Sequence, residues 1–224
     1  AVTNAVMEAG FKNVDTYIDL AKNTGINAMV VDIKDGVLAY ELNVAREYSP
    51  TAYKNAINSF SDYQNAIKKI KDAGFYVIGR IVVFNDSHYG KDHPDDCIVS
   101  SSSSRLWPSA YSRGAWEYNV NLALEAAREM KFNEIQFDYV RFPEDAYKMS
   151  TSGGTDFKNI YDEEKAEAIQ NFLFYAADQI HKANVYFSVD VFGECSNTYV
   201  TAYGQYWPAI SNIVDVISAM PYTD

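Results

Sequence analysis

The side chains best placed for chemistry lie in the segment 134–143, Glu-Ile-Gln-Phe-Asp-Tyr-Val-Arg-Phe-Pro, which predicts a buried β-strand. Alternation along a strand puts Gln136 and Asp138 on one face and the apolar residues on the other. A carboxylate inside a sheet is costly unless something pairs with it or uses it. Pro143 has no N–H for a sheet ladder, so we expect the strand to end there. Asp138 then lies near the carboxyl end, which faces the substrate in a (β/α)8 barrel.

Three other apolar segments predicted as strands, residues 28–35, 75–84 and 185–192, also carry polar residues: Asp32, Lys34, Arg80 and Asp190. Strands of a parallel sheet are buried on both faces. Polar side chains packed against the helices would be costly, whereas at the top of a barrel lumen they can contact a substrate. We therefore assign these residues to the lumen face. Alternation then predicts that Asp32 and Lys34 share this face.

Asp138 and Asp190 both come late in strands that we expect to be neighbours. Adjacent strands are about 4.8 Å apart, so the two carboxyls are expected within roughly 5–8 Å of each other. Paired carboxyls at such distances hydrolyse glycosidic bonds. One is protonated and assists the leaving oxygen, and the other is ionised and attacks or activates water.

Each candidate also has a structural interpretation. Asp32, Asp138 and Asp190 would then be salt-bridged to Lys34, Arg80 or Arg141. Glu194, just past the segment 185–192, replaces Asp190 as the acid or, in the interpretation that we favour, is an exposed loop residue. Trp107 beside Pro108 packs within a loop or forms a platform for a sugar ring.

The segment 85–111 resembles a metal-binding loop only in composition, with two histidines and several aspartates: His88, His93, Asp86, Asp92, Asp95 and Asp96. The spacing fits no tight metal site, so a solvated acidic loop is the better interpretation. We therefore predict no metal and no other cofactor.

The elements that must position these residues alternate between helix and strand. Helices are predicted at 14–21, 61–74, 112–130, 162–183 and near 200–211, and a fifth strand at 214–220. Residues 36–60, 85–111 and 144–160 are predicted as loops, with a turn at Gly153-Gly154. Such alternation predicts right-handed βαβ units around a parallel sheet, either open and doubly wound or closed into a barrel. No Gly-rich nucleotide fingerprint is present. We expect a (β/α)8 barrel, incomplete in this chain because five strands are visible.

Composition limits the partners and the domain count. A chain of 224 residues with 48% hydrophobic residues supports one core, so residues 1–224 are predicted as a single domain. The net charge of -11 disfavours nucleic acid and anionic membranes as partners. No apolar segment approaches the roughly 20 residues of a membrane-spanning helix. Cys97 and Cys195 form neither a disulfide framework nor a metal motif.

Five segments in order resemble the glycosyl hydrolase domain family once catalogued as a domain of unknown function, a relative of the α-amylase-like TIM-barrel hydrolases. The segments are Gly25–Asp35, Gly79–Phe84, Trp107-Pro108 through Trp116–Asn119 to the segment 134–143, Ser188–Gly193 and Ile217–Tyr222. The resemblance spans nearly the whole chain. It implies a (β/α)8 barrel that acts on a polysaccharide, in a secreted or surface-anchored bacterial protein.

The resemblance also implies roles for the carboxyl groups. Asp138 matches the fourth-strand nucleophile of the amylase-like barrels, and a fifth-strand carboxyl matches the acid/base. Two positions differ from that pattern. Gln136 stands where those enzymes carry an Arg, and Asp190, with Glu194 further on, stands in place of the usual Glu.

These observations predict a glycoside hydrolase with Asp138 and Asp190, or Glu194, as its catalytic carboxyls. Residues expected to orient them or to hold the carbohydrate are Asp32, Lys34, Arg80, Gln136, Tyr139, Arg141 and Trp107. One alternative is a catalytically inactive barrel that binds glycans in a cell envelope. Another is a metal-dependent barrel enzyme with Asp32, Asp138 and Asp190 as oxygen ligands.

Overall fold

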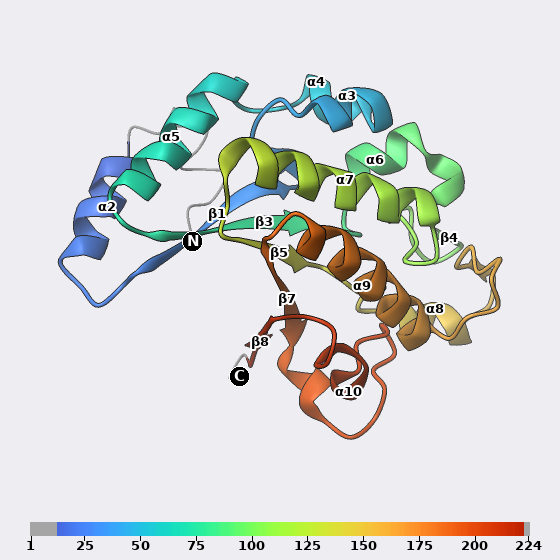
Figure 1. The fold of residues 1–224 in the computed structure, drawn as a ribbon. Helices are drawn as coiled ribbons and strands as arrows, with labels where there is room; N and C mark the ends of the chain where they lie inside the picture. Colours follow the sequence, from blue (N-terminus) through green and yellow to red (C-terminus); the bar gives the residue numbers. More distant parts are fainter. Residues whose placement is uncertain (1–12, 222–224) are drawn as a thin grey trace.

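Five parallel strands form the centre of the protein, as predicted (Figure 1). The computed structural model describes residues 13–221. Its sheet has the order β2-β1-β3-β5-β7-β8, and β2 is a short antiparallel addition at one edge. The bounds are β1 (Ala28–Asp35), β2 (Val37–Leu38), β3 (Tyr76–Val82), β5 (Glu134–Asp138), β7 (Tyr186–Phe192) and β8 (Val216–Met220). Within the described residues this sheet stays open between β2 and β8 and does not close into a ring.

Three long helices cover one face of the sheet, α5 (Phe60–Asp72), α7 (Arg113–Met130) and α9 (Lys165–Lys182) (Figure 1). α7 packs against α5 and α9 and also contacts β3 and β5, and α2 (Val14–Lys22) lies against α5. A row of helices on one face leaves the other face for a lumen, which is the layout of a (β/α) barrel and not of a doubly wound sheet. α7 begins where predicted because the Ser112 side chain accepts a hydrogen bond from the amide of Ala115 (3.0 Å).

The prediction of loop structure for residues 36–60 is wrong. This segment contains β2, α3 (Asn43–Tyr48) and α4 (Pro50–Lys54). Pro50 starts α4 instead of breaking a helix, since a proline is tolerated at the first helical position, and Ser49 caps the helix. α5 starts at Phe60, one residue before the predicted start at 61, because the Ser59 hydroxyl accepts from the amide of Asp62.

The two long connections after β3 and β5 also contain short elements. The first holds α6 (Ser87–Asp92), the 3-10 helix η1 (Pro94–Asp96) and β4 (Val99–Ser100), and the second holds α8 (Ala146–Thr151) and β6 (Thr155–Asp156). β4 and β6 pair as a small antiparallel sheet. The predicted turn at Gly153-Gly154 is confirmed, with φ of +74° and +69°. The remaining short helices are η2 (Gly193–Ser196) and α10 (Trp207–Ile210).

The strand that carries Asp138 is shorter than predicted. β5 ends at Asp138 itself and not at Pro143, because Tyr139 adopts a left-handed backbone conformation with φ of +53°. Asp138 is therefore the last residue of its strand, and Arg141 lies in the following loop. Tyr222, the last residue of the fifth segment named above, lies outside the described residues. Among the described helices, none has the length and apolar character needed to span a bilayer.

Candidate active site

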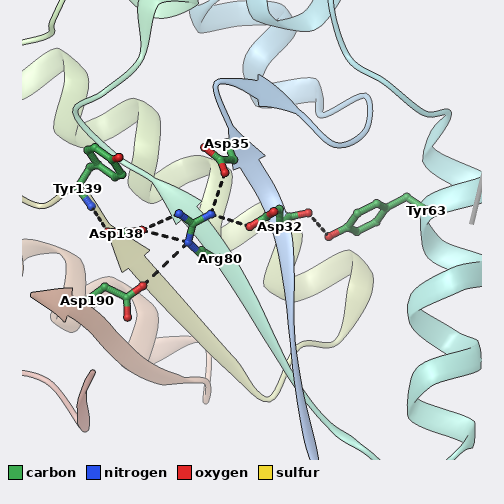
Figure 2. Close-up of polar contacts among 7 residues, drawn as sticks. All are labelled: Asp32, Asp35, Tyr63, Arg80, Asp138, Tyr139 and Asp190. Atoms are coloured by element: carbon green, nitrogen blue, oxygen red, sulfur yellow. Dashed lines mark hydrogen bonds and ion pairs between the residues drawn. The ribbon is translucent and has the colours of Figure 1, made fainter. Parts of the chain in front are cut away.

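The guanidinium of Arg80, on β3, lies at the centre of four aspartates from the carboxyl-terminal halves of β1, β5 and β7 (Figure 2). Its Nη1 donates to Asp32 Oδ1 (2.8 Å) and to Asp35 Oδ2 (3.2 Å). Its Nη2 and Nε donate to Asp138 Oδ2 at 2.6 and 3.2 Å, and Nε lies 4.0 Å from Asp190 Oδ2. The cluster is largely removed from solvent, since Asp32, Asp138 and Asp190 are 2%, 6% and 8% exposed. Asp32 and Asp138 are therefore salt-bridged to Arg80, and Asp190 lies beside it, as the structural interpretation of the sequence expected.

The carboxyls of Asp138 and Asp190 lie close together. β5 and β7 are paired strands, which confirms the prediction that they are neighbours. Both Oδ2 atoms contact the same Nε of Arg80, so they are at most about 7 Å apart, within the range in which paired carboxyls act on glycosidic bonds. Burial, together with the negative charge of Asp138, raises the pKa of Asp190 to about 7, against the opposing effects of Arg80 and Ser218.

Asp138 has a different environment, rich in donors. Besides the two bonds from Arg80, its Oδ1 accepts from the backbone amide of Tyr139 (2.7 Å). That amide is directed at the carboxyl by the left-handed conformation of Tyr139, which costs an ordinary residue about 1 to 2 kcal/mol. Three donors stabilise the ionised form of a carboxyl. Asp138 thus accepts three hydrogen bonds, whereas Asp190 is buried beside Asp138 and has a raised pKa.

The lumen face below this cluster is also polar. Gln136 lies two residues before Asp138 on β5, and its amide donates to the Ser218 hydroxyl of β8 (3.4 Å). At the amino end of the same strand, Glu134 accepts from the Tyr76 hydroxyl (3.0 Å). On the opposite face of the sheet, Tyr63 of α5 donates to the backbone carbonyl of Asp32 (2.9 Å). Asp35 and Ser218 belong to the site but were not among the predicted site residues. Asp35 ends β1, and Ser218 is in register with Asp190 on the neighbouring strand, and these positions are the signal that points to them.

Lys34 does not share the face of Asp32, so that prediction is wrong. The register of β1 against β3 shifts between Asp32 and Lys34, which interrupts the alternation of side chains. The ammonium of Lys34 is buried toward the helices and donates to Asp86 (2.6 Å) and to Asn119 of α7 (2.7 Å). Burial lowers the pKa of Lys34, and the charge of Asp86 opposes this effect. Lys34 therefore ties β1 to the helical layer.

Replacing Lys34 by Met is expected to destabilise the protein by about 3 to 5 kcal/mol, because Asp86 is then left as a buried charge without its cation. Urea denaturation measures the change. The double variant Lys34→Met/Asp86→Asn removes the uncompensated charge and should recover part of this loss. A double variant less stable than Lys34→Met would contradict this account of the pair.

Arg141, Tyr139 and Trp107 form a stacked group beside the carboxyls. The Arg141 guanidinium lies 4.6 Å from the Tyr139 ring centre and 5.5 Å from that of Trp107. It donates to Glu144 (2.7 Å) and to the carbonyl of Phe142 (3.1 Å), and not to Asp138. Trp107 is buried, with 1% of its surface exposed, so its ring is not an open platform. Only Tyr139 of this group contacts a carboxyl of the cluster, through its amide.

Glu194 is an exposed residue of η2, as favoured from the sequence. Its carboxylate accepts hydrogen bonds from the hydroxyls of Tyr199 (2.8 Å) and Tyr203 (2.9 Å). The prediction of a solvated acidic loop between 85 and 111 is wrong for Asp86, and two further aspartates are half-buried. Asp86 is buried and accepts a hydrogen bond from the ammonium of Lys34. Asp92 accepts from Ser49 and Thr51, and Asp96 accepts from the hydroxyl of Tyr89.

The carboxyls of the cluster surround an internal cation. Among residues 13–221 no group of three or more His, Cys, Asp or Glu side chains is arranged to hold a metal ion. Arg80 instead bridges Asp32 and Asp138 and lies beside Asp190. A divalent ion bound by these three aspartates would have to displace the guanidinium.

Comparison with known families gives one match that covers almost the whole chain. The family described as "Putative glycosyl hydrolase domain" matches residues 2–223. Among solved structures, a hypothetical protein from Ruminiclostridium thermocellum is 33% identical, with a TM-score of 0.67. The similarity covers 84% of this chain and 95% of that one. No curated protein matches.

Two glycoside hydrolase structures share the fold at lower identity. The PgaB (BpsB) glycoside hydrolase domain from Bordetella bronchiseptica is 14% identical with a TM-score of 0.64, over 93% of this chain and 68% of that one. The maltogenic α-amylase AmyB from Thermotoga neapolitana is 12% identical with a TM-score of 0.55, over 93% of this chain and 44% of that one. At these identities the likeness shows a common fold and leaves the chemistry to the site.

Proposed function

We propose that this chain, which belongs to the putative glycosyl hydrolase domain family, hydrolyses glycosidic bonds of a polysaccharide with Asp138 and Asp190 as its two catalytic carboxyls. The observation that carries the proposal is their pairing at the carboxyl edge of the sheet, around one guanidinium. Carboxyl ends of the strands are where barrel enzymes bind substrate.

The environments of the two carboxyls support a division of roles. Asp138 accepts three hydrogen bonds, two of them from Arg80, which suits the ionised nucleophile or base. Asp190, with its pKa raised by burial and by Asp138 to about 7, suits the protonated acid. Asp32 holds the other side of Arg80 and so positions it.

The remaining candidates take different parts in this proposal. Gln136 and Tyr139 border the carboxyls and are proposed to contact the sugar. Arg141 and Trp107 support Tyr139 by stacking. Glu194 is proposed as an exposed residue that follows β7, and Lys34 as a support of the fold.

Incubation of the protein with a panel of plant and bacterial polysaccharides tests the proposal, with new reducing ends as the readout. At least one polymer should be cleaved, and cleavage should be unchanged by a chelator because Arg80 supplies the positive charge. Activity that vanishes with chelator and returns with a divalent ion would instead select the metal-dependent alternative. Glycan binding by calorimetry without released sugar would select the inactive binding barrel.

A polysaccharide substrate also suggests where the protein works. Such polymers occur mainly outside cells or in their envelopes, so we propose an extracellular or cell-surface location in a bacterium. Fractionation of cells that express the full-length protein tests this, and recovery in the cytosol alone would contradict it.

A further inference from the structure

A cavity of about 220 Å³ lies beyond the carboxyl end of β5, apart from the carboxyl cluster. The serine-rich segment 100–105 forms one wall, and residues 143–149, which lead into α8, form the other. β4 and α8, which flank it, lie at the end of the sheet to which β3 and β5 point (Figure 1). Pockets for drug-sized ligands measure about 300 to 1,000 Å³, so this cavity suits a smaller unit such as one sugar ring.

The chemistry of the walls matches such a ring. Hydroxyls of Ser100, Ser102 and Ser103 offer donors and acceptors, and the largely buried side chains of Trp107 and Met149 form the apolar back of the cavity. A sugar ring has the same division, with hydroxyls around its edge and C–H groups on its faces. Serine hydroxyls donate and accept equally well, so they suit sugar hydroxyls.

The charges at the cavity do not suit an anionic sugar. Arg105 lies 3.7 Å from the carboxylate of Glu144, which also pairs with Arg141 at 2.7 Å. Asp145 lines the cavity and has no ion-pair partner among residues 13–221. The cavity lining thus carries one cation, Arg105, and two carboxylates, Glu144 and Asp145, which disfavours a uronate or a sulfated unit.

The cavity is linked to the carboxyls by two aromatic side chains. Trp107, on its wall, lies 6.2 Å from the ring centre of Tyr139. The amide of Tyr139 donates to Asp138. These two contacts place the cavity beside Tyr139, the residue that follows Asp138.

We propose that this cavity is a separate subsite for an uncharged sugar unit of the polysaccharide that is cleaved at Asp138 and Asp190. The proposal rests on the proposed function and adds a substrate class to it: neutral chains of several units, and not polyanions. Binding energy from such a remote unit would favour long substrates over short ones.

Filling the cavity with Ser102→Trp tests the proposal, and Ser104→Trp is the matched control, because Ser104 is exposed, lies two residues away and does not line the cavity. The probes are neutral hexasaccharides of glucose and of N-acetylglucosamine, a galacturonate oligomer and the aryl monoglycoside of any sugar that is released. Ser102→Trp should raise KM for the cleaved hexasaccharide at least about tenfold, or about 1.4 kcal/mol, and leave kcat/KM for the aryl monoglycoside unchanged. Ser104→Trp should change neither value.

Calorimetry with the same oligosaccharides separates the subsite from catalysis. If no sugar is released but Ser102→Trp still weakens binding of a neutral hexasaccharide at least tenfold, the subsite stands and the proposed hydrolysis fails. Equal binding by the wild type and Ser102→Trp, tighter binding of the galacturonate oligomer, or no binding of any probe would overturn the subsite.

Discussion

Replacing Asp138 by Asn is expected to lower kcat on a cleaved polysaccharide by about 10³-fold or more, because an amide can neither attack the sugar nor take a proton from water. The fold should be retained, since Arg80 keeps Asp32 and Asp35 as partners. The Asn oxygen can still accept from the amide of Tyr139. Reducing-end assays measure the rate, and circular dichroism with thermal melting checks the fold.

Glu134→Gln is the matched control for this variant. Glu134 is also a buried carboxyl on β5 and on the same face, but it lies at the opposite end of the strand and accepts from Tyr76. Its replacement removes a buried charge from the lumen without touching Arg80 and should keep kcat within a few-fold of the wild type. Equal losses in the two variants would mean that Asp138 acts through the stability of the lumen and not in the reaction.

The arrangement of Asp32, Arg80, Asp138 and Asp190 could be anticipated because it depends on regular features. Alternation within strands and the pairing of successive parallel strands place these side chains on one face. Buried polar residues on a parallel strand need partners, and Arg80 was among the three cations that the sequence offered to these aspartates. The pairing of β5 with β7 confirms the adjacency on which the distance between the carboxyls depended.

The errors come from local departures that alternation does not detect. The register shift after Asp32 turns Lys34 toward α7. No residue type between Asp32 and Lys34 indicates this shift in the sequence. The left-handed Tyr139 ends β5 five residues early, although Tyr rarely adopts this conformation. Tertiary contacts hold both, so a single sequence contains little signal for them.

Asp190 is expected to determine the alkaline limb of the pH dependence. Burial and the charge of Asp138 raise its pKa to about 7, so kcat/KM should fall as pH rises through that value, because the acid loses its proton. Asp190→Asn should remove this limb and lower the rate on polysaccharide by about 10² to 10⁴-fold. An aryl glycoside with a good leaving group needs little protonation and should lose much less. A retained alkaline limb in Asp190→Asn would assign the acid to another group.

The same pKa predicts how Asp190 affects stability. An unfolded Asp has a pKa of about 3.9, so the folded protein keeps a proton that the unfolded chain releases between about pH 4 and pH 7. The contribution of Asp190 to stability is therefore most favourable below about pH 4, declines as pH rises through this window and is constant above about pH 7. The full decline amounts to about 4 kcal/mol.

Asp190→Asn carries no such proton, so its stability relative to the wild type should increase between pH 4 and pH 7 and then level off. Urea denaturation of both proteins at intervals from pH 4 to pH 8 measures this difference, and groups that titrate alike in both cancel. A site that keeps a destabilising carboxyl for its chemistry is expected to gain stability when that carboxyl is removed. A difference that does not vary with pH would mean that Asp190 ionises like an exposed residue, and the acid role proposed for it would then lose its physical basis.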